Sequence, residues 1–495
     1  MRKALILIAL LSAGLAVLFE ISTGSLLDSE YQNLSAFPSA SKEANPVVEW
    51  NRILLGIVRT PGAQAPTVHP TRSFAMMHAA IYDAVNAIDR RYQPYLVHLE
   101  NASPGASQEA AANAAAHDVL VALYPKTRAT LDTEFQRLQA QTPYGEDKTA
   151  GLDLGQTVAA RILALRENDG SSAQPVPYIF GDTPGDYQAP PPSPAGQQPQ
   201  FTHWSRVTPF ALNRADQFRP GPPPSLTSNA YTQALNEIRV RGIANSTASS
   251  PEQALTGRFW NGAIQNYWNE IAQTAVLANR STTAQSARVF ALLNLAIADE
   301  VIAFYDAKYR YNFWRPVTAI RAPGTDITRH SAADTKWLPE VQKTTPDPAY
   351  PGAHAVISAG AAAVLTSMFG SDQFAFSITS EVLPGVERSF TSFAAAAEEA
   401  TLSRIYAGVH FRTDLTAGQE LGRQIASFVI NKFMTPLNAT DGYDDGQSTS
   451  ELNPHASSTR RAKYRSNQKV NLPSVSPIQG KGVPTQERKR SSEAV

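Results

Sequence analysis

The sequence predicts an all-α protein in which two helical bundles are joined by a long proline-rich loop, with the functional site in the C-terminal bundle. Three observations predict this fold class. Apolar residues recur at helical spacing through most of the chain between residues 72 and 434. A strand pattern is confined to QFAFSIT at 373–379 and a partner near 386–392. Between residues 173 and 225, the runs APPPSP and RPGPPPS exclude regular structure and divide the helical segments into two groups.

Five regions follow from the composition along the chain. Residues 1–20 join a basic start, MRK, to the apolar run ALILIALLSAGLAVLF, which predicts a signal peptide or an uncleaved signal anchor. We expect residues 21–46 to be a linker, 47–225 an N-terminal helical region that includes the proline-rich loop (173–225), and 226–436 a second helical domain. Residues 437–495 are basic without apolar periodicity and predict a disordered tail. The leader predicts a secreted or periplasmic protein, or one tethered by its anchor.

The overall composition restricts the class of partner. The 43 Lys and Arg residues balance 43 Asp and Glu residues, so no net charge attracts nucleic acid, and we expect no nucleic-acid partner. No apolar stretch after residue 20 predicts an integral membrane core. Cysteine is absent, which leaves histidine and carboxylate as the strong metal ligands. The oligomeric state is not predicted.

The helical segments follow from the spacing of their apolar residues. The segment 72–89 carries His78 among apolar neighbours, which favours a hydrogen-bonded core histidine over a ligand. The segment 284–309 is apolar nearly all round, so Asp299 and Asp306 within it need buried partners. The predicted helices are 72–89, 108–123, 126–141, 146–168, 228–241, 251–278, 284–309, 355–369, 391–407 and 412–434.

Two basic residues, Lys308 and Arg315, stand in the frame K-x6-R-P. A spacing of seven residues is two helical turns, so both cations can face one side of a helix. Pro316 favours an extended conformation at Arg315, which aims the guanidinium from a helix end. The first motif therefore supplies two cations.

A second motif, PAYPGAHA, places Gly352, Ala353 and His354 directly before the helical segment 355–369. The backbone N–H groups of a tight turn and of a helix N-terminus then lie beside a histidine. Such an arrangement is typical of an anion site.

The third motif is SRIYAGVHFRTD at 403–414, with Arg404, His410 and Asp414 on a segment whose alanine-rich approach predicts a helix. A histidine and an aspartate four residues apart lie on one helix face, so Asp414 can hold the His410 imidazole in one tautomer. The alternative is that these polar residues only lie on the protein surface. The three motifs together provide three cations, a turn of N–H donors and two histidines within about 110 residues. This set suits a tetrahedral or trigonal-bipyramidal oxyanion, in which cations neutralise equatorial oxygens and the histidines ligate and move protons.

In order along the chain, these motifs resemble the signature shared by vanadium-dependent haloperoxidases and the acid phosphatases of the type 2 phosphatidic acid phosphatase superfamily. The flanks YNFWRPVTAIR and SRIYAGVHFR, with the segment RFWNGAIQNYWNEIA, are similar to the haloperoxidase branch. The resemblance covers roughly residues 50–433. It implies a vanadate-dependent haloperoxidase that oxidises halide with hydrogen peroxide to hypohalous acid, which then halogenates a small organic acceptor.

The resemblance also implies residue roles by position. His410 is the axial ligand of vanadate, the metal-bearing cofactor, and His354 is the acid–base group beside the apical oxygen. Lys308 polarises bound peroxide. The groups that hold vanadate oxygens are Lys308, Arg315 and Arg404 with the backbone N–H groups of Gly352 and Ala353. The expected supporting residues are Asp414, Asp347 and Asp299.

Two departures bear on the chemistry. The family's Ser-Gly before the second-motif histidine is Gly352-Ala353 here, so a hydroxyl that bonds an equatorial oxygen is missing, a loss of roughly 1 to 2 kcal/mol. Asp347 stands seven residues before His354, where members often carry Phe or His and where an inward carboxylate repels halide.

Two alternatives stay open. The first is an acid phosphatase that binds phosphate, with His410 attacking phosphorus and His354 protonating the leaving group. The second is a non-catalytic oxyanion-binding relative.

Overall fold

The fold is all-α, as the apolar periodicity predicts. The computed structural model describes residues 45–191, 193, 197–322 and 333–437. These residues lie within one compact unit that ends at Ala439, and a second unit, Thr440–Val495, is outside them. The predicted leader (1–20) lies outside the described residues. So do the linker (21–46) except for residues 45 and 46, and the basic tail (437–495) except for residue 437. Among the described helices, none is both long and apolar enough to cross a membrane.

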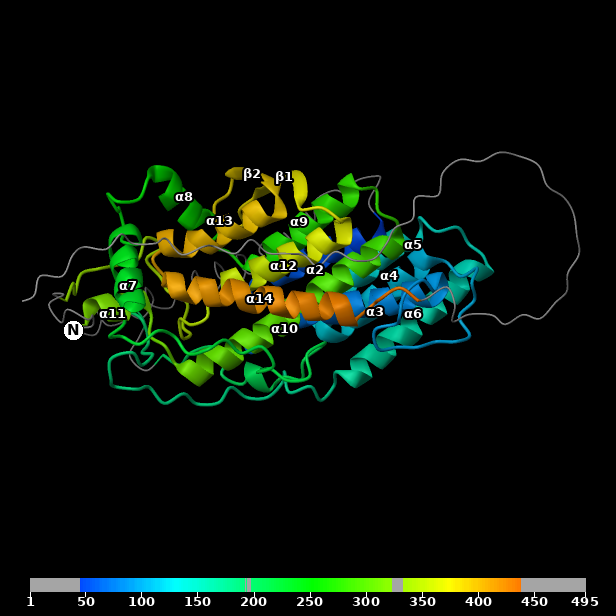
Figure 1. Cartoon of the computed structure of the whole chain (residues 1–495). Helices are drawn as coiled ribbons and strands as arrows, with labels where there is room; N and C mark the ends of the chain where they lie inside the picture. Colours follow the sequence, from blue (N-terminus) through cyan, green and yellow to red (C-terminus); the bar gives the residue numbers. More distant parts are fainter. Residues whose placement is uncertain (1–44, 192, 194–196, 323–332, 438–495) are drawn as a thin grey trace, which may run out of the picture. The chain divides into compact units, whose positions relative to one another are not determined.

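The N-terminal helices pack around α4. Helix α4 packs on both α3 and α6, and α2 and α5 pack against α4. Figure 1 shows these helices in blue and cyan beside one end of α10. Their bounds are α2 Pro46–Arg59, α3 Thr71–Asp89, α4 Gln108–Leu123, α5 Arg128–Gln139 and α6 Glu146–Leu165, with a 3-10 turn η2 at Pro125–Thr127.

The C-terminal helices pack around α12. Helix α12 packs on α14 and α13, and α10 packs on both α12 and α3, so it joins the two groups. Figure 1 shows α10 and α14 as the two long helices of this arrangement. The bounds are α7 Asn229–Arg241, α8 Pro251–Phe259, α9 Ile264–Ala278, α10 Thr283–Tyr311, α11 Pro316–Arg321, α12 Ala353–Phe369, α13 Phe393–Tyr406 and α14 Arg412–Lys432.

The predicted strand pair is present as an antiparallel hairpin. Strands β1 (Gln373–Thr379) and β2 (Glu387–Ser392) pair Phe376 with Phe390. Both phenylalanines are buried with their rings in tilted contact, and the ring of Phe376 also contacts Phe393 at the start of α13. The apolar side of the hairpin therefore covers the C-terminal helices.

The proline-rich loop lies against the helices. The hydroxyl of Tyr311 on α10 donates to the carbonyl of Pro220 at 2.6 Å, and that of Tyr350 donates to the carbonyl of Gly221 at 2.8 Å. The backbone N–H of Tyr187 bonds the carbonyl of Asn312 at 2.7 Å. The loop also contains a 3-10 turn, η3, at Trp204–Arg206. Tyrosine hydroxyls thus satisfy carbonyls that a proline-rich segment cannot pair within itself.

Three details differ from the sequence expectations. The predicted helix 251–278 is broken at residues 260–263 into α8 and α9. Lys308 and Arg315 do not share a helix, because α10 ends at Tyr311 and Arg315 precedes α11 in an extended conformation (φ −83°, ψ 153°). His410 lies in the loop between α13 and α14, where Gly408 adopts φ +80°, a conformation that ends a helix.

Candidate active site

The three motifs meet at the ends of four helices. Lys308 is in the last turn of α10, Arg315 precedes α11, His354 is in the first turn of α12, and Arg404 is in the last turn of α13. His410 follows in the loop before α14. All five side chains therefore come from helix ends or from the connections between helices.

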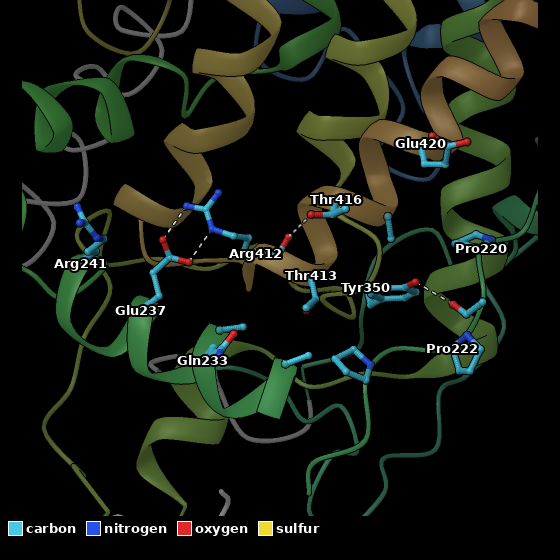
Figure 2. A pocket seen from close by; sticks show the side chains of 15 residues that line it. Pro220, Pro222, Gln233, Glu237, Arg241, Tyr350, Arg412, Thr413, Thr416 and Glu420 are labelled. Carbon is cyan, nitrogen blue, oxygen red and sulfur yellow. Dashed lines mark hydrogen bonds and ion pairs between the residues drawn. The ribbon is translucent and has the colours of Figure 1, made fainter. Parts of the chain in front are cut away.

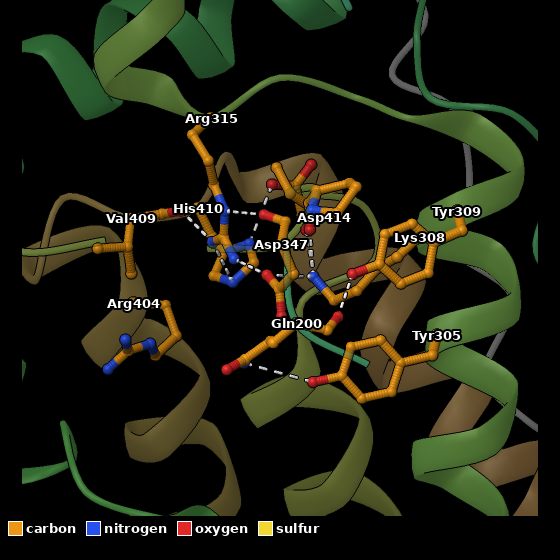
Figure 3. Close-up of polar contacts among 12 residues, drawn as sticks. Gln200, Tyr305, Lys308, Tyr309, Arg315, Asp347, Arg404, Val409, His410 and Asp414 are labelled. Carbon is orange, nitrogen blue, oxygen red and sulfur yellow. Dashed lines mark hydrogen bonds and ion pairs between the residues drawn. The ribbon is translucent and has the colours of Figure 1, made fainter. Parts of the chain in front are cut away.

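The His410 imidazole is held between a carboxylate and a guanidinium (Figure 3). Its Nδ1 lies 3.2 Å from Oδ2 of Asp414, and its Nε2 lies 3.0 Å from Nη1 of Arg315. A guanidinium only donates, so Nε2 carries the lone pair and Nδ1 carries the proton. Burial, then the positive charge of Arg315, holds the pKa of His410 well below its usual value. His410 is therefore a neutral imidazole with Nε2 available as a ligand atom.

Asp414 meets His410 through a helix N-terminus and not across one helix face. Asp414 is in the first turn of α14, and its Oδ2 also accepts the backbone N–H of Phe411 at 3.0 Å. Burial raises the pKa of Asp414 to about 7, against the lowering effect of that N–H bond. The same carboxylate thus caps α14 and orients the imidazole.

Lys308 is fully buried and faces Asp347 and the chain after it. Its Nζ lies 3.4 Å from Oδ1 of Asp347 and 3.5 Å from the carbonyl of Ala349, and it donates a short bond to the carbonyl of Pro348. An ammonium has three protons, and three acceptors surround it. Burial lowers the pKa of Lys308 to about 8, although the negative charge of Asp347 opposes this.

Arg315 is bound by the same aspartate. Its Nη2 donates to Oδ1 of Asp347 in a short ion pair, and its Nε donates to the Asp347 carbonyl at 2.8 Å. Its Nη1 donates to the carbonyl of Val409 at 2.9 Å and faces His410. Four acceptors therefore face the five N–H groups of Arg315.

Arg404 has fewer partners. Its Nη2 donates to Oδ1 of Asn261 at 3.2 Å, and its Nη1 lies 3.4 Å from the carbonyl of Trp260. Within the described part of the chain its buried Nε has no partner. Burial, then the charge of Arg315, lowers the pKa of Arg404 to about 9. Arg404 thus keeps donors free for an anion.

His354 is oriented by the break between α8 and α9. Its Nε2 lies 2.8 Å from the carbonyl of Trp260, an oxygen that can only accept. Nε2 therefore carries the proton, and Nδ1 is the basic atom. Burial, then Arg404, holds the pKa of His354 well below its usual value, so the imidazole is neutral.

The turn before α12 offers fewer N–H groups than the sequence predicts. The N–H of Gly352 donates to the backbone carbonyl of Asp414 at 2.9 Å, so it joins the turn to α14. Ala353 is the first residue of α12, and its N–H and those of the next two residues have no partner inside the helix. A Cβ on Gly352 would lie 2.9 Å from Cδ2 of Leu415, so Leu415 fills the space that a side chain at this position would need.

Two carboxylates of α10 lie outside this group. Asp299, expected to support the site, accepts the backbone N–H groups of Phe210, Ala211 and Leu212 at 2.6–2.7 Å and so anchors the proline-rich loop. Asp306 forms two bonds, of 2.6 and 2.8 Å, with Arg219. His78 is a core residue, as predicted: it is fully buried, contacts Asn51 at 2.9 Å and stacks on Phe290.

The sequence analysis missed the break at 260–263 and its role. The carbonyl of Trp260 accepts from both His354 and Arg404, and Asn261 accepts from Arg404. Glu381 holds the same loop by accepting the N–H of Ala263 at 2.6 Å. The Asn-Gly pair at 261–262 is a turn signal that could have revealed the break.

A separate cavity of about 1000 Å³ lies between the proline-rich loop, α7 and the start of α14 (Figure 2). Two of its charged residues, Glu237 and Arg412, pair with each other at 2.6 and 2.8 Å. Tyr350 lines it, but Lys308, Arg315, Asp347, His354, Arg404 and His410 do not. This cavity is therefore distinct from the cluster of motif residues.

Comparison with known proteins shows which proteins the chain is similar to. Residues 288–439 match the family model described as the VCPO second helical-bundle domain. A bacterial vanadium-dependent iodoperoxidase of known structure is 28% identical, with a TM-score of 0.66 over 79% of this chain and 96% of its own. The chain is a relative of the vanadium haloperoxidases.

Two further relatives extend this likeness. The vanadium chloroperoxidase of Curvularia inaequalis is 25% identical over 76% of this chain and 80% of its own length. A bacterial vanadium-dependent chloroperoxidase is 17% identical with a TM-score of 0.58, covering 81% of this chain and 94% of its own, which shows a shared fold. The haloperoxidase likeness therefore spans both helical groups.

Proposed function

We propose that this haloperoxidase relative is a vanadate-dependent haloperoxidase that oxidises halide with hydrogen peroxide to hypohalous acid. The observation that carries the proposal is that His410, whose Nε2 lone pair is set by Asp414, lies within the electrostatic reach of the cations of the first and third motifs, Lys308, Arg315 and Arg404. A small organic acceptor of the hypohalous acid belongs to the proposal, as does export, for which the apolar leader sequence is the support.

The residues present fit a tetrahedral oxyanion such as vanadate. Arg404 has a buried Nε with no partner among the described residues, an arrangement that an anion oxygen would satisfy. The N–H groups at the start of α12 and the positive end of its dipole lie beside His354. Nε2 of His410 would ligate the vanadium, and Arg404, Arg315, Lys308 and the N–H of Ala353 would hold the oxygens. When bound, vanadate supplies a Lewis acid that activates hydrogen peroxide for attack by halide.

The chain's own residues have three tasks in this reaction. Asp414 keeps the proton on Nδ1 of His410, so that Nε2 stays a ligand. Nδ1 of His354 accepts a proton from incoming peroxide, since its Nε2 is committed to the carbonyl of Trp260. The cations offset the negative charge that develops on oxygen when the O–O bond breaks.

Paired assays on the purified protein test the proposal. We expect halide oxidation that requires both vanadate and peroxide. Phosphomonoester hydrolysis without vanadate, inhibited when vanadate is added, would instead support the acid phosphatase alternative. Neither activity, together with measurable oxyanion binding, would support a non-catalytic relative.

A further inference from the structure

Asp347 carries a buried negative charge at the centre of the site. Its side chain is 5% exposed, and one oxygen, Oδ1, faces both Lys308 and Arg315. Figure 3 shows this carboxylate between the two cations and beside His410. A carboxylate that bridges two buried cations neutralises part of the charge that would otherwise attract an anion.

The three cations of the site differ in how many of their N–H donors already have acceptors. The three protons of Lys308 face Asp347, Pro348 and Ala349. Arg315 is likewise committed, with Nε and Nη2 on Asp347.

Arg404 differs from both, because its Nε is buried without a partner in the described residues and its two bonds are longer, at 3.2 and 3.4 Å. The free donors are therefore on the cation that Asp347 does not touch.

We propose that Asp347 is the specificity-determining residue of this site: its carboxylate acts as an internal counter-ion to Lys308 and Arg315, so the site selects oxyanions of low charge and binds them mainly through Arg404. The inference rests on the proposed function only in taking this cluster as the oxyanion site. The internal carboxylate raises the cost of each additional negative charge on the bound anion. Doubly charged anions are disfavoured most.

The size of the effect follows from Coulomb's law. One guanidinium joins Asp347 to His410, so an anion at His410 lies on the order of 6 Å from the carboxylate. At an effective dielectric constant of about 20, a unit charge at that separation changes affinity by about 100-fold for each charge on the anion. Reorganisation of the freed cations reduces this, and we expect at least tenfold per charge.

The test compares two tetrahedral oxyanions, perchlorate with one charge and sulfate with two, by calorimetry. Asp347→Asn should raise the perchlorate affinity at least tenfold and the sulfate affinity by about the square of that factor. Asp306→Asn is the matched control, because it removes a carboxylate from an arginine pair outside the site and should leave both affinities unchanged. Asp347→Ser provides a second removal of the charge if the asparagine variant folds poorly.

The donor division gives a second readout. Arg404→Gln should lower sulfate affinity in the wild-type background more than Lys308→Gln does, whereas in the Asp347→Asn background the loss from Lys308→Gln should grow. Equal gains for perchlorate and sulfate, unchanged affinities, or a loss of affinity in Asp347→Asn would each overturn the proposal. Neither anion tests vanadate chemistry, so absent peroxidase activity with the predicted affinities would refute the proposed function alone.

Discussion

Raising the pH from 7 to 9 should weaken sulfate binding by at least about twofold and at most about 20-fold, the upper value holding only if Asp347 left the charge of Lys308 fully available to the anion. Burial lowers the pKa of Lys308 to about 8 and that of Arg404 to about 9. A bound anion favours the protonated form of both groups, so affinity is full below these pKa values and falls as the pH rises through them. Between about pH 7 and about pH 9 the protonated fraction falls about tenfold for Lys308 and about twofold for Arg404.

Sulfate suits this measurement because its charge is constant over the whole range. Calorimetry at each pH, in two buffers of different ionisation enthalpy, gives both the affinity and the number of protons taken up on binding. The Lys308→Gln variant retains only the titration of Arg404, so its sulfate affinity should fall about twofold over the same range. An affinity that stays constant or rises between pH 7 and pH 9 in the wild type would refute the reasoning.

Two further predictions concern the loop that carries His410. Gly408→Ala should lower the free energy of unfolding, measured in urea, by about 2 kcal/mol more than Gly370→Ala does. Both glycines have φ near +75°, but only at Gly408 would the new Cβ meet a backbone oxygen, that of Gly242 at 2.2 Å. Equal losses in the two variants would show that this crowding is unimportant. Asp414→Asn should weaken vanadate binding in equilibrium dialysis about tenfold, since the His410 tautomer loses its carboxylate partner, and unchanged binding would remove Asp414 from the site.

The long apolar segments of the fold could be predicted from sequence because burial leaves a periodic record. The pattern of residues 284–309 predicts α10, and the alternation of residues 373–379 predicts β1. The break at 260–263 does not interrupt the apolar pattern of its flanks, so in the sequence only the Asn-Gly pair at 261–262 marks it. It is stabilised by contacts from distant parts of the chain, including Glu381.

At the candidate site, too, the sequence predicts one part of the structure and leaves another part unpredicted. Motif spacing selects Arg315, Arg404 and His410, and these side chains do lie together, but spacing does not give the direction of a side chain. The carboxylate of Asp347 was expected to act on halide if it pointed inward; it does point inward, and its partners are Lys308 and Arg315. Those contacts depend on the turn after Asp347 and on the extended backbone at Arg315.

The most direct test of the central claim is a titration of apo-protein with vanadate in the presence of hydrogen peroxide and bromide. We expect halide oxidation to rise linearly to one vanadate per chain and then remain constant. His410→Ala should show no such rise, whereas His117→Ala, a half-buried histidine paired with Asp118 and Asp132, should match the wild type. Full vanadate-dependent activity in His410→Ala, or wild-type activity independent of vanadate, would contradict the account.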